Sequence, residues 1–334
     1  MTTPLLTWYD EQKRPLPWRM NPSPYAVMVS EAMLQQTQVA TVIPYFNRFM
    51  AQYPSVTDLA AAELETVLKS WEGLGYYRRA RHLHACARAI VAIGAFPTQA
   101  VEWQQLPGIG AYSSAAIASI AFGQPIACVD GNVTRVIARH YLVRDDVSKS
   151  KGKARIQSLA SEFLHMDRPG DHNQAMMELG ARVCLPSQPK CDQCPIAKSC
   201  VTHIEGVNPI NLPHKTARTK VRSQQLHALL VIKDDRFMIA RRRAGLLLGG
   251  LWELPVTERV PATSKRITAV KHRFTHIQAL YHLHLVEHYE VEADVYDQIQ
   301  WVRSDDQGYP FTKVYYLQKP FIEQTLNNYD MLVR

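Results

Sequence analysis

The sequence has no apolar run near the ~18 residues that a membrane-spanning helix needs. Its six cysteines among 334 residues are too few for a disulfide-stapled scaffold. Residues 1–19 carry four charged side chains before Arg19 and lack the apolar centre of a signal peptide. No internal repeat and no low-complexity tract is present. We therefore expect a soluble, intracellular protein, placed in the cytoplasm and without a membrane partner.

Acidic residues are absent between Glu205 and Asp234, whereas five basic residues fall in that interval. With Pro209 and Pro213, this composition predicts a basic interdomain linker over 207–225. A chain of this length suggests two domains. The net charge of +8 is compatible with a polyanionic partner but does not identify one.

Hydrophobic spacing differs on the two sides of this linker. Residues 1–206 have helical periodicity, with helices expected over 30–49, 58–71, 79–93 and 111–122 and with Ser30 as the cap of the first. Residues 226–334 are rich in strand patterns, at 227–232, 237–240, 277–286 and 299–302, followed by a helical tail over 317–327. The sequence thus predicts a mainly α domain followed by an α+β domain.

A glycine-containing turn, Leu106–Gly110, joins two of the helical segments. Gly108 and Gly110 allow a sharp turn whose bare N–H groups, with the next helix N-terminus, suit a phosphate. A plain helix–helix connection is the alternative. Twenty residues further on, Asp130 stands at a turn just before another helical segment.

Four of the six cysteines lie within 17 residues, in the spacing C-x6-C-x2-C-x5-C: Cys184, Cys191, Cys194 and Cys200. The polar residues between them disfavour free thiols in a core. Four thiolates in a short loop can hold either zinc or a [4Fe–4S] cluster, and the thiolates alone leave both open.

These motifs carry a resemblance. LPGIG at 106–110, VDGNV at 129–133 and the cysteine spacing resemble the helix–hairpin–helix DNA glycosylase superfamily, whose cysteine loop holds a [4Fe–4S] cluster. SEAMLQQTQ at 30–38 and GLGYY at 73–77 resemble its MutY-type adenine DNA glycosylases, and the match spans nearly the whole chain. The resemblance implies a base excision repair enzyme that contains this cluster.

The resemblance assigns roles to several residues. Glu31 matches the acid that protonates adenine, and Asp130 matches the carboxylate that stabilises the oxocarbenium-like sugar, with Asn132 beside it. An exposed first-turn glutamate and a helix cap are the alternatives for the two acids. Tyr112 stands where lyase-competent relatives have a lysine, which predicts a glycosylase with weak lyase activity or none.

Further positions match the binding of a flipped adenine and of its surroundings. The adenine pocket is expected from Arg14, Trp18, Arg19 and Glu178. For Trp18 a core anchor is an equal alternative. Gln36, Leu74 and Tyr76 match residues that enter the duplex or contact the opposing base, and one of Arg78, Arg79 and Arg81 is expected to touch DNA.

The second domain resembles Nudix-type domains at Leu248–Pro255, but the closely spaced glutamates that bind Mg²⁺ in their hydrolases are absent. Phe274, Thr275 and His276 resemble the Phe-Ser-His loop that recognises 8-oxoguanine, with Thr in place of Ser. A surface strand end is the alternative for this loop.

We therefore predict an adenine DNA glycosylase that acts, as a monomer, on duplex DNA with adenine opposite 8-oxoguanine or guanine. Three other functions each fit part of the sequence: a bifunctional glycosylase/lyase for oxidised pyrimidines, a metal-stapled DNA-binding protein without catalysis, and a nucleotide pyrophosphohydrolase. Tyr112 disfavours the lyase, Glu31 and Asp130 disfavour a protein without catalysis, and the missing Mg²⁺ ligands disfavour the pyrophosphohydrolase.

Overall fold

The computed structural model describes residues 3–216, 221–260, 263–274 and 276–329. The chain divides into two compact units. The first contains residues 1–62 and 78–217, and the second contains residues 63–77 and 218–334. Residues 63–77 therefore belong to the second unit, although they lie within the helical half of the sequence.

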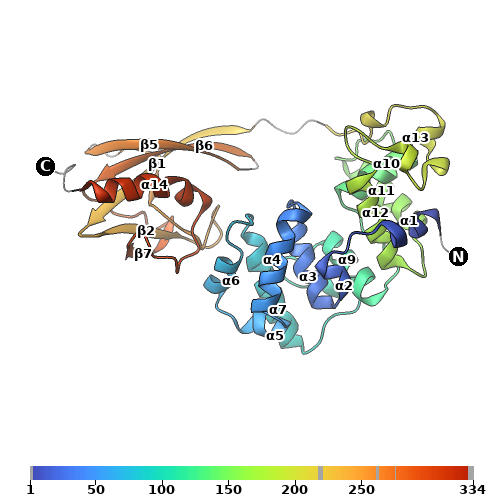
Figure 1. Ribbon diagram of the computed structural model, residues 1–334, viewed down its shortest axis with the longest axis horizontal. Helices are drawn as coiled ribbons and strands as arrows, with labels where there is room; N and C mark the ends of the chain where they lie inside the picture. Colours follow the sequence, from blue (N-terminus) through green and yellow to red (C-terminus); the bar gives the residue numbers. More distant parts are fainter. Residues whose placement is uncertain (1–2, 217–220, 261–262, 275, 330–334) are drawn as a thin grey trace. The chain divides into compact units, whose positions relative to one another are not determined.

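The first unit is helical throughout its described part (Figure 1). Its longer elements are α1 Pro4–Gln12, α3 Pro24–Leu34, α4 Val39–Gln52, α7 Arg78–Ile93, α9 Ala111–Phe122, α10 Gly131–His140, α11 Ser150–Phe163 and α12 Pro169–Arg182. Short helices complete it: α2 Pro17–Met20, α5 Val56–Ala61, α8 Ala100–Trp103 and α13 Val201–Ile204, with 3₁₀ turns at Cys191–Gln193, Ala197–Ser199 and Pro209–Asn211.

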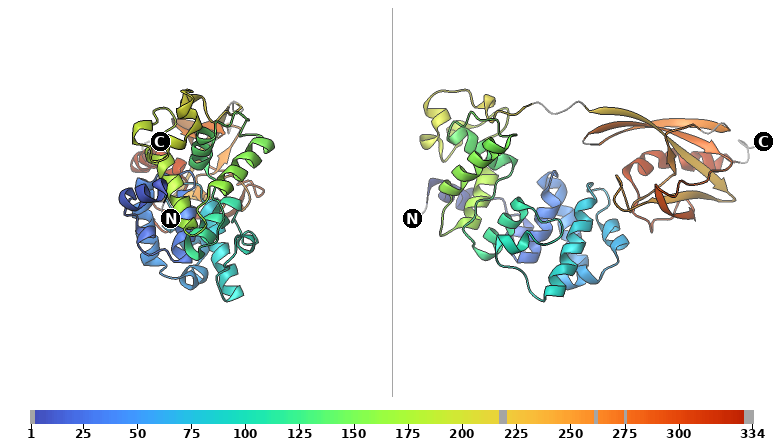
Figure 2. Two further views of the ribbon diagram at one scale, coloured as in Figure 1. Left: turned by 90° about the vertical axis from the view of Figure 1, so that its right-hand side faces the viewer. Right: turned by 180° about the vertical axis from the view of Figure 1, so that it is seen from behind.

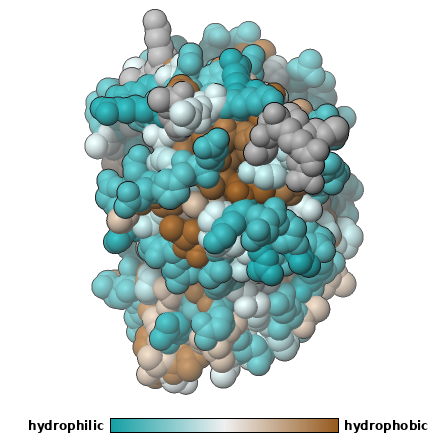
Figure 3. Space-filling view, turned by 90° about the vertical axis from the view of Figure 1, so that its left-hand side faces the viewer, coloured by the Kyte–Doolittle hydropathy of each residue, from teal (hydrophilic) through white to brown (hydrophobic). Residues whose placement is uncertain are grey.

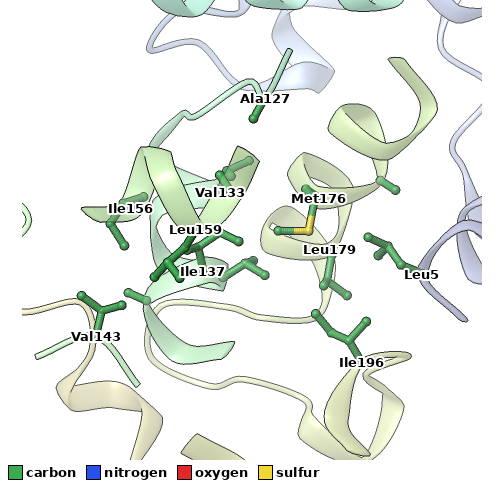
Figure 4. Close-up of a cluster of buried hydrophobic side chains, with 14 of the residues drawn as sticks. Leu5, Ala127, Val133, Ile137, Val143, Ile156, Leu159, Met176, Leu179 and Ile196 are labelled. Atoms are coloured by element: carbon green, nitrogen blue, oxygen red, sulfur yellow. The ribbon is translucent and has the colours of Figure 1, made fainter. Parts of the chain in front are cut away.

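One core cluster holds together α10, α11 and α12, the helices that position the second half of the site. Val133, Ile137, Leu159, Met176 and Leu179 are all at most 3% exposed and point toward one another (Figure 4). Burying each of these side chains contributes about 1.5–3 kcal/mol to the stability of the fold. This packing therefore holds α10, with its N-terminus, in place against α11 and α12.

The predicted helix over 30–49 was wrong in its extent and in its cap. The structure has two helices there, α3 and α4, and Ser23 caps α3 by accepting the Ala26 N–H at 3.1 Å. Pro24, at the first helical position, favours this earlier start. Ser30 is buried inside α3, and the turn at Gln36, with φ 58°, separates the helices.

The predicted helix over 58–71 is likewise two helices, α5 and α6 Leu64–Ser70. In contrast, 111–122 is confirmed without change, and 79–93 is confirmed within one residue, with Gly94 ending it at φ 84°.

The second unit contains a mixed seven-stranded sheet with α14 Lys313–Asn327 against one face, visible in front and rear views (Figures 1 and 2). The strands are β1 Arg222–Lys233, β2 Arg236–Arg242, β3 Trp252–Glu253, β4 Val256–Thr257, β5 Ser264–Arg273, β6 Ile277–Val286 and β7 Tyr296–Val302. β1 and β6 run parallel, from Arg222 opposite Ile277 to Val231 opposite Val286. The other pairings are antiparallel.

All four predicted strands are present, but β3, β4 and β5 were missed. β5 is an edge strand that carries four basic residues, and its register shifts between Arg266 and Thr268, so no clean alternation marks it. β1 begins at Arg222, inside the stretch predicted as linker. The tail helix starts at Lys313, four residues before its predicted start.

The core of this unit lies between the sheet and α14. Leu230, Ile239, Leu283, Trp252 and Tyr315 are 0–1% exposed within it. Hydrophilic side chains cover most of the surface at this end of the chain, with apolar groups in a central band (Figure 3). Among the described residues, no helix has the length and apolar character needed to cross a membrane.

Candidate active site

Glu31 lies near the C-terminal end of α3 and is 6% exposed. Within the described residues its Oε2 has no hydrogen-bond partner. Burial is the main reason why the pKa of Glu31 is raised to about 7; the charge of Asp130 adds to this, and a hydrogen bond with Tyr112 opposes it. A carboxyl group with this pKa is protonated in about half of the molecules at pH 7, so it can act as an acid near neutral pH.

Asp130 caps the N-terminus of α10. Its Oδ1 accepts the Val133 N–H at 2.7 Å, and its Oδ2 accepts the side-chain N–H of Asn132 at 3.0 Å. Burial raises the pKa of Asp130, and these hydrogen bonds oppose the rise by stabilising the charged form. The helix-cap alternative and the predicted catalytic position are thus compatible, because a carboxylate with two donors still offers lone pairs to the site.

Asn132 is itself held from behind. Its Oδ1 accepts a hydrogen bond from Arg135 Nη2 at 2.9 Å, and the same nitrogen donates to the Gly180 carbonyl at 2.7 Å. Gly180 lies so close that an added Cβ would meet the Asn132 Cβ at 2.6 Å. Sequence reasoning missed Arg135 and Gly180 as supports of the site, and no sequence signal marked the contact between α10 and α12.

One cavity of about 440 Å³ brings together most of the predicted site residues. It is lined by all four predicted catalytic residues, by all four predicted adenine-pocket residues and by Gln36. Its volume lies within the range typical of small-molecule sites. The cavity lies wholly in the first unit, with walls from α3, α9, α10 and α12.

A buried glutamate and two arginines form one wall of this cavity. Arg14 donates two hydrogen bonds to Glu178, at 2.5 and 2.9 Å, and Arg19 Nη2 donates a third at 2.9 Å. Burial alone would raise the pKa of Glu178, but the hydrogen bonds and charges of the arginines outweigh it, and the pKa is lowered. On this wall, therefore, the charge of the Glu178 carboxylate is balanced by two arginines, whose guanidinium groups are held in place by their hydrogen bonds to it.

Sequence reasoning also missed two neighbours on α12. Gln174 accepts a hydrogen bond from Arg19 Nε at 3.1 Å, and Met177 contacts the Tyr112 hydroxyl through its sulfur at 3.1 Å. Gln174 lies one helical turn before Glu178, so the i, i+4 spacing was a usable signal for it. Burial raises the pKa of Tyr112 well above its usual range, which keeps the hydroxyl protonated.

Trp18 is 6% exposed and packs edge-on against Phe46, with ring centroids 5.3 Å apart. It also lines the cavity. Trp18 is therefore anchored in the core, and its place in the cavity lining is compatible with the predicted role beside adenine, which stays a prediction.

The two glycines of the turn at 106–110, Gly108 and Gly110, have different structural roles. Gly108 has φ 76°, and a Cβ there would meet the His82 side chain at 2.3 Å, so the position requires glycine. Gly110 is the N-cap of α9, and nothing lies within 4 Å of an added Cβ. Gly110 thus leaves the helix N-terminus bare, as the phosphate hypothesis requires.

Arg79 caps the end of the helix that carries Glu31. Its Nη1 donates to the carbonyls of Ala32, Met33 and Gln35, at 3.1, 2.8 and 2.5 Å. Its Nη2 donates to Thr37 Oγ1 at 3.2 Å, so Arg79 braces the turn that contains Gln36.

The remaining predicted DNA contacts belong to the second unit. Leu74 is 6% exposed, and Tyr76 is 48% exposed with φ 52°. Phe274 and His276 lie at the turn between β5 and β6, where the Phe274 N–H donates to the Ile277 carbonyl at 2.8 Å. Thr275 lies outside the described residues.

The four clustered cysteines line a second cavity, of about 260 Å³. Arg139 Nη1 approaches Cys184 Sγ at 3.4 Å, and Cys200 Sγ approaches the Arg139 carbonyl at 3.5 Å. In the described ranges, no group of three or more His, Cys, Asp or Glu side chains is arranged to hold a single metal ion. All four thiols line one cavity, and the Arg139 guanidinium beside Cys184 would complement an anionic group bound there.

Comparisons with known proteins agree with these observations. Residues 29–162 match the family model of the HhH-GPD superfamily base excision DNA repair protein, and residues 227–316 match a NUDIX domain. A solved thermostable thymine-DNA glycosylase shares 26% identity, with a TM-score of 0.54 over 60% of this chain and 94% of that one. The fold and the site therefore define a DNA glycosylase of the helix–hairpin–helix class, extended by a Nudix-like domain.

Two relatives narrow the class. An adenine DNA glycosylase of Rattus norvegicus is 36% identical over 87% of this chain and 69% of its own length. The adenine DNA glycosylase of Homo sapiens is 49% identical over 59% of this chain, and the match covers 38% of the human protein. The chain belongs to the adenine DNA glycosylase family. The predicted fold class, a helical glycosylase domain with a Nudix-like α+β domain, is confirmed.

Proposed function

We propose that this chain removes adenine from duplex DNA in which the adenine lies opposite 8-oxoguanine or guanine. The observation that carries the proposal is the pair of carboxyl groups in one cavity. Glu31 has no described partner for Oε2 and a pKa raised to about 7, whereas Asp130 accepts two N–H groups. Two carboxyl groups in unlike environments are suited to divide the roles of acid and charge stabiliser.

In the proposed reaction, Glu31 protonates a ring nitrogen of the flipped adenine. The bond from C1′ of the sugar to the base then breaks, and its electron pair leaves with adenine. Asp130 stabilises the positive charge on the sugar until water adds to C1′ and gives its proton to the Glu31 carboxylate, which yields free adenine and an abasic site and restores the acid. Tyr112 carries no amine that could attack C1′ and form a Schiff base, so strand cleavage is weak or absent.

The wall of Arg14, Arg19 and Glu178 supplies donors and an acceptor for the edge of the base, and Trp18 supplies an apolar surface. Flipping the base out of the duplex costs a few kcal/mol. We assign to Gln36, Leu74 and Tyr76 the contacts with the duplex that offset this cost. Phe274 and His276, with Thr275 between them, are the proposed contacts to the opposing 8-oxoguanine.

We further propose that Cys184, Cys191, Cys194 and Cys200 hold a [4Fe–4S] cluster. When bound, the cluster cross-links the loop that packs on α10 through Arg139. Purified protein should be yellow-brown and contain iron and sulfide in equal amounts. A Cys191→Ser variant should lose both the iron and the sulfide. Cys86→Ala is the control and should keep them, because Cys86 is buried outside the cysteine loop, where its thiol hydrogen-bonds to the sulfur of Met28 at 3.6 Å. Colourless protein that contains zinc would refute the cluster.

The test of the proposed activity is single-turnover excision on duplexes that differ in one base pair. Adenine opposite 8-oxoguanine and opposite guanine should be released, and adenine opposite thymine should be released far more slowly. A duplex with an oxidised pyrimidine and a nucleoside triphosphate, assayed in parallel, test the lyase and pyrophosphohydrolase alternatives. Binding without release of any base would leave a non-catalytic DNA-binding protein as the correct description.

A further inference from the structure

The segment Glu63–Tyr77 contains α6 and the turn that presents Leu74 and Tyr76, and it forms part of the second unit. Side-chain contacts join it to the C-terminal part of that unit. Trp252 Nε1 donates to Glu65 Oε1 at 2.6 Å, and Lys69 Nζ donates to the Tyr309 carbonyl at 3.1 Å. These contacts bring together residues about 190 and 240 positions apart in the chain.

The backbone of a single residue, Phe311, contacts both ends of this turn. The Phe311 N–H donates to Glu72 Oε1 at 3.0 Å, and the Phe311 carbonyl accepts the Tyr77 hydroxyl at 3.4 Å. Glu72 also binds Lys69 Nζ at 2.7 Å through its other oxygen. Burial, together with a hydrogen bond to Glu72, raises the pKa of Tyr316 in α14. The turn over residues 73–76 thus lies between two hydrogen bonds to the backbone of one residue, Phe311.

Phe311 itself is rigidly held. Phe311 is 2% exposed and stacks on Tyr315, with ring centroids 3.9 Å apart and planes at 12°. The backbone beside it pairs with Trp252, which donates to the Pro310 carbonyl and accepts from the Thr312 N–H, both at 3.0 Å. Thr312 caps α14. Displacing Phe311 would therefore disrupt β3, the cap and the aromatic stack together.

The turn needs such support. Gly73, Gly75 and Tyr76 have φ values of 88°, 76° and 52°. The left-handed conformation is costly for a bulky residue such as Tyr76, on the order of 1–2 kcal/mol, and persists where the surroundings enforce it. Trp71 Nε1 also donates to the Gly75 carbonyl at 3.1 Å, which fixes the middle of the turn.

We propose that Phe311, with Glu72 and Tyr77, positions Leu74 and Tyr76 for the opposing base, so that the Nudix-like domain acts on recognition through this turn as well as through its own loop at 274–276. Glu72 and Tyr77 are then positioning residues for specificity. This inference rests on the proposed function, because it concerns discrimination at the opposing base.

The test compares the wild type with Glu72→Ala, Glu72→Gln, Tyr77→Phe and the Glu72→Ala/Tyr77→Phe double variant. The readout is the ratio of single-turnover excision rates for adenine opposite 8-oxoguanine and opposite guanine. We expect the double variant to lower this ratio about tenfold, the size of one or two partly buried hydrogen bonds. Glu72→Gln keeps an oxygen that can accept the Phe311 N–H, so it should retain more of the ratio than Glu72→Ala.

Hydrogen exchange of residues 72–77 in the same proteins gives a readout that does not depend on catalysis. Amide exchange over the turn should accelerate in the double variant and in Tyr77→Phe, which removes one oxygen atom and keeps the ring. Asp297→Asn is the matched control: it removes an ion pair with Arg241 in the same unit, 2.9 Å long, and leaves both hydrogen bonds between Phe311 and the turn in place. It should change neither readout.

The outcomes separate the two hypotheses. If the wild type excises no adenine opposite either base, the proposed function fails. If the wild type is active and Tyr77→Phe and the double variant keep both the wild-type ratio and the wild-type exchange of residues 72–77, the positioning role is overturned. A ratio that falls equally in Asp297→Asn would also overturn it, since any loss of domain stability would then suffice.

Discussion

The two units differ in where they keep the residues expected to act. In the first unit, Glu31 and Glu178 are 6% and 1% exposed. Burial raises the pKa of Glu31, whereas Arg14 and Arg19 outweigh burial at Glu178 and lower its pKa. In the second, Tyr76 is 48% exposed and His276 is exposed at the end of a strand. Buried charges change reactivity, whereas exposed rings and turns change which surface is contacted. Variants of the first unit should therefore alter the rate of excision, and variants of the second should alter discrimination.

Among variants that should keep some excision, the largest loss is expected at Asp130. In Asp130→Asn the amide oxygen can still accept the Val133 N–H and cap α10, but the negative charge near the sugar is lost. Excision should slow by about 10²–10³-fold, the usual cost of removing one electrostatic stabiliser of a transition state. Single-turnover rates measure this. Asp146→Asn is the control, because Asp146 accepts the Ser148 N–H at an exposed turn. Equal slowing in both variants would contradict the assigned role.

Glu178→Gln should have the next largest effect. It leaves Arg14 and Arg19 without their buried carboxylate, so we expect at least tenfold slower excision and a stability loss of about 3 kcal/mol at pH 7. The folded-state pKa of Glu178 lies below its usual value of 4.5, so its stabilisation is complete above 4.5 and is lost as the pH falls through the folded value.

Chemical denaturation at pH 7 and at pH 3 checks this prediction, because the difference between wild type and Glu178→Gln should narrow at the lower pH. Asp171→Asn, on the same helix, removes an exposed ion pair with Arg168 and should cost less than about 1 kcal/mol. A difference between wild type and Glu178→Gln that widens toward low pH would refute the assignment.

In the second unit, His276→Ala should lower the preference for 8-oxoguanine over guanine several-fold and leave the rate opposite guanine within about twofold, because only the exposed turn changes. The comparison between the units predicts the reverse for Asp130→Asn: a slower rate opposite both bases and an unchanged preference. If His276→Ala slows excision opposite both bases equally, the division between chemistry and recognition is wrong.

Tyr112→Lys should have the smallest effect, a gain of function. A lysine amine beside Glu31 and Asp130 can attack C1′, so a small fraction of the protein should be trapped on DNA by borohydride. Tyr112→Phe should give no adduct. The absence of trapping in Tyr112→Lys, with adenine release retained, would contradict the placement of this residue near the sugar.

The sequence predicted those structural features that neighbouring residues cause, and it missed those that depend on residues far away in the chain. The helix over 111–122 and the Asp130 cap depend on neighbouring residues: the sequence predicted the helix and offered the cap as the alternative role of Asp130. The break at Gln36 depends in part on Arg79, more than 40 residues away, and was missed. Glu31 was assigned by resemblance, because its burial, which raises its pKa, arises only when α3 packs against α9 and the other helices.

The membership of residues 63–77 in the second unit had no local signal either. Their helical pattern is like that of their neighbours, and the partners Trp252 and Phe311 come more than 180 residues later. Gly180 beside Asn132 is a similar case, since only the folded chain shows the close approach that requires glycine.

The most direct test of the central claim is the pH dependence of adenine release from a duplex with adenine opposite 8-oxoguanine, measured for the wild type and Glu31→Gln. A proton donor with a pKa of about 7 must be protonated to act, so the wild-type rate should fall as the pH rises through that value. Glu31→Gln should bind the duplex and release no adenine at any pH. Near-normal release by Glu31→Gln would contradict the account.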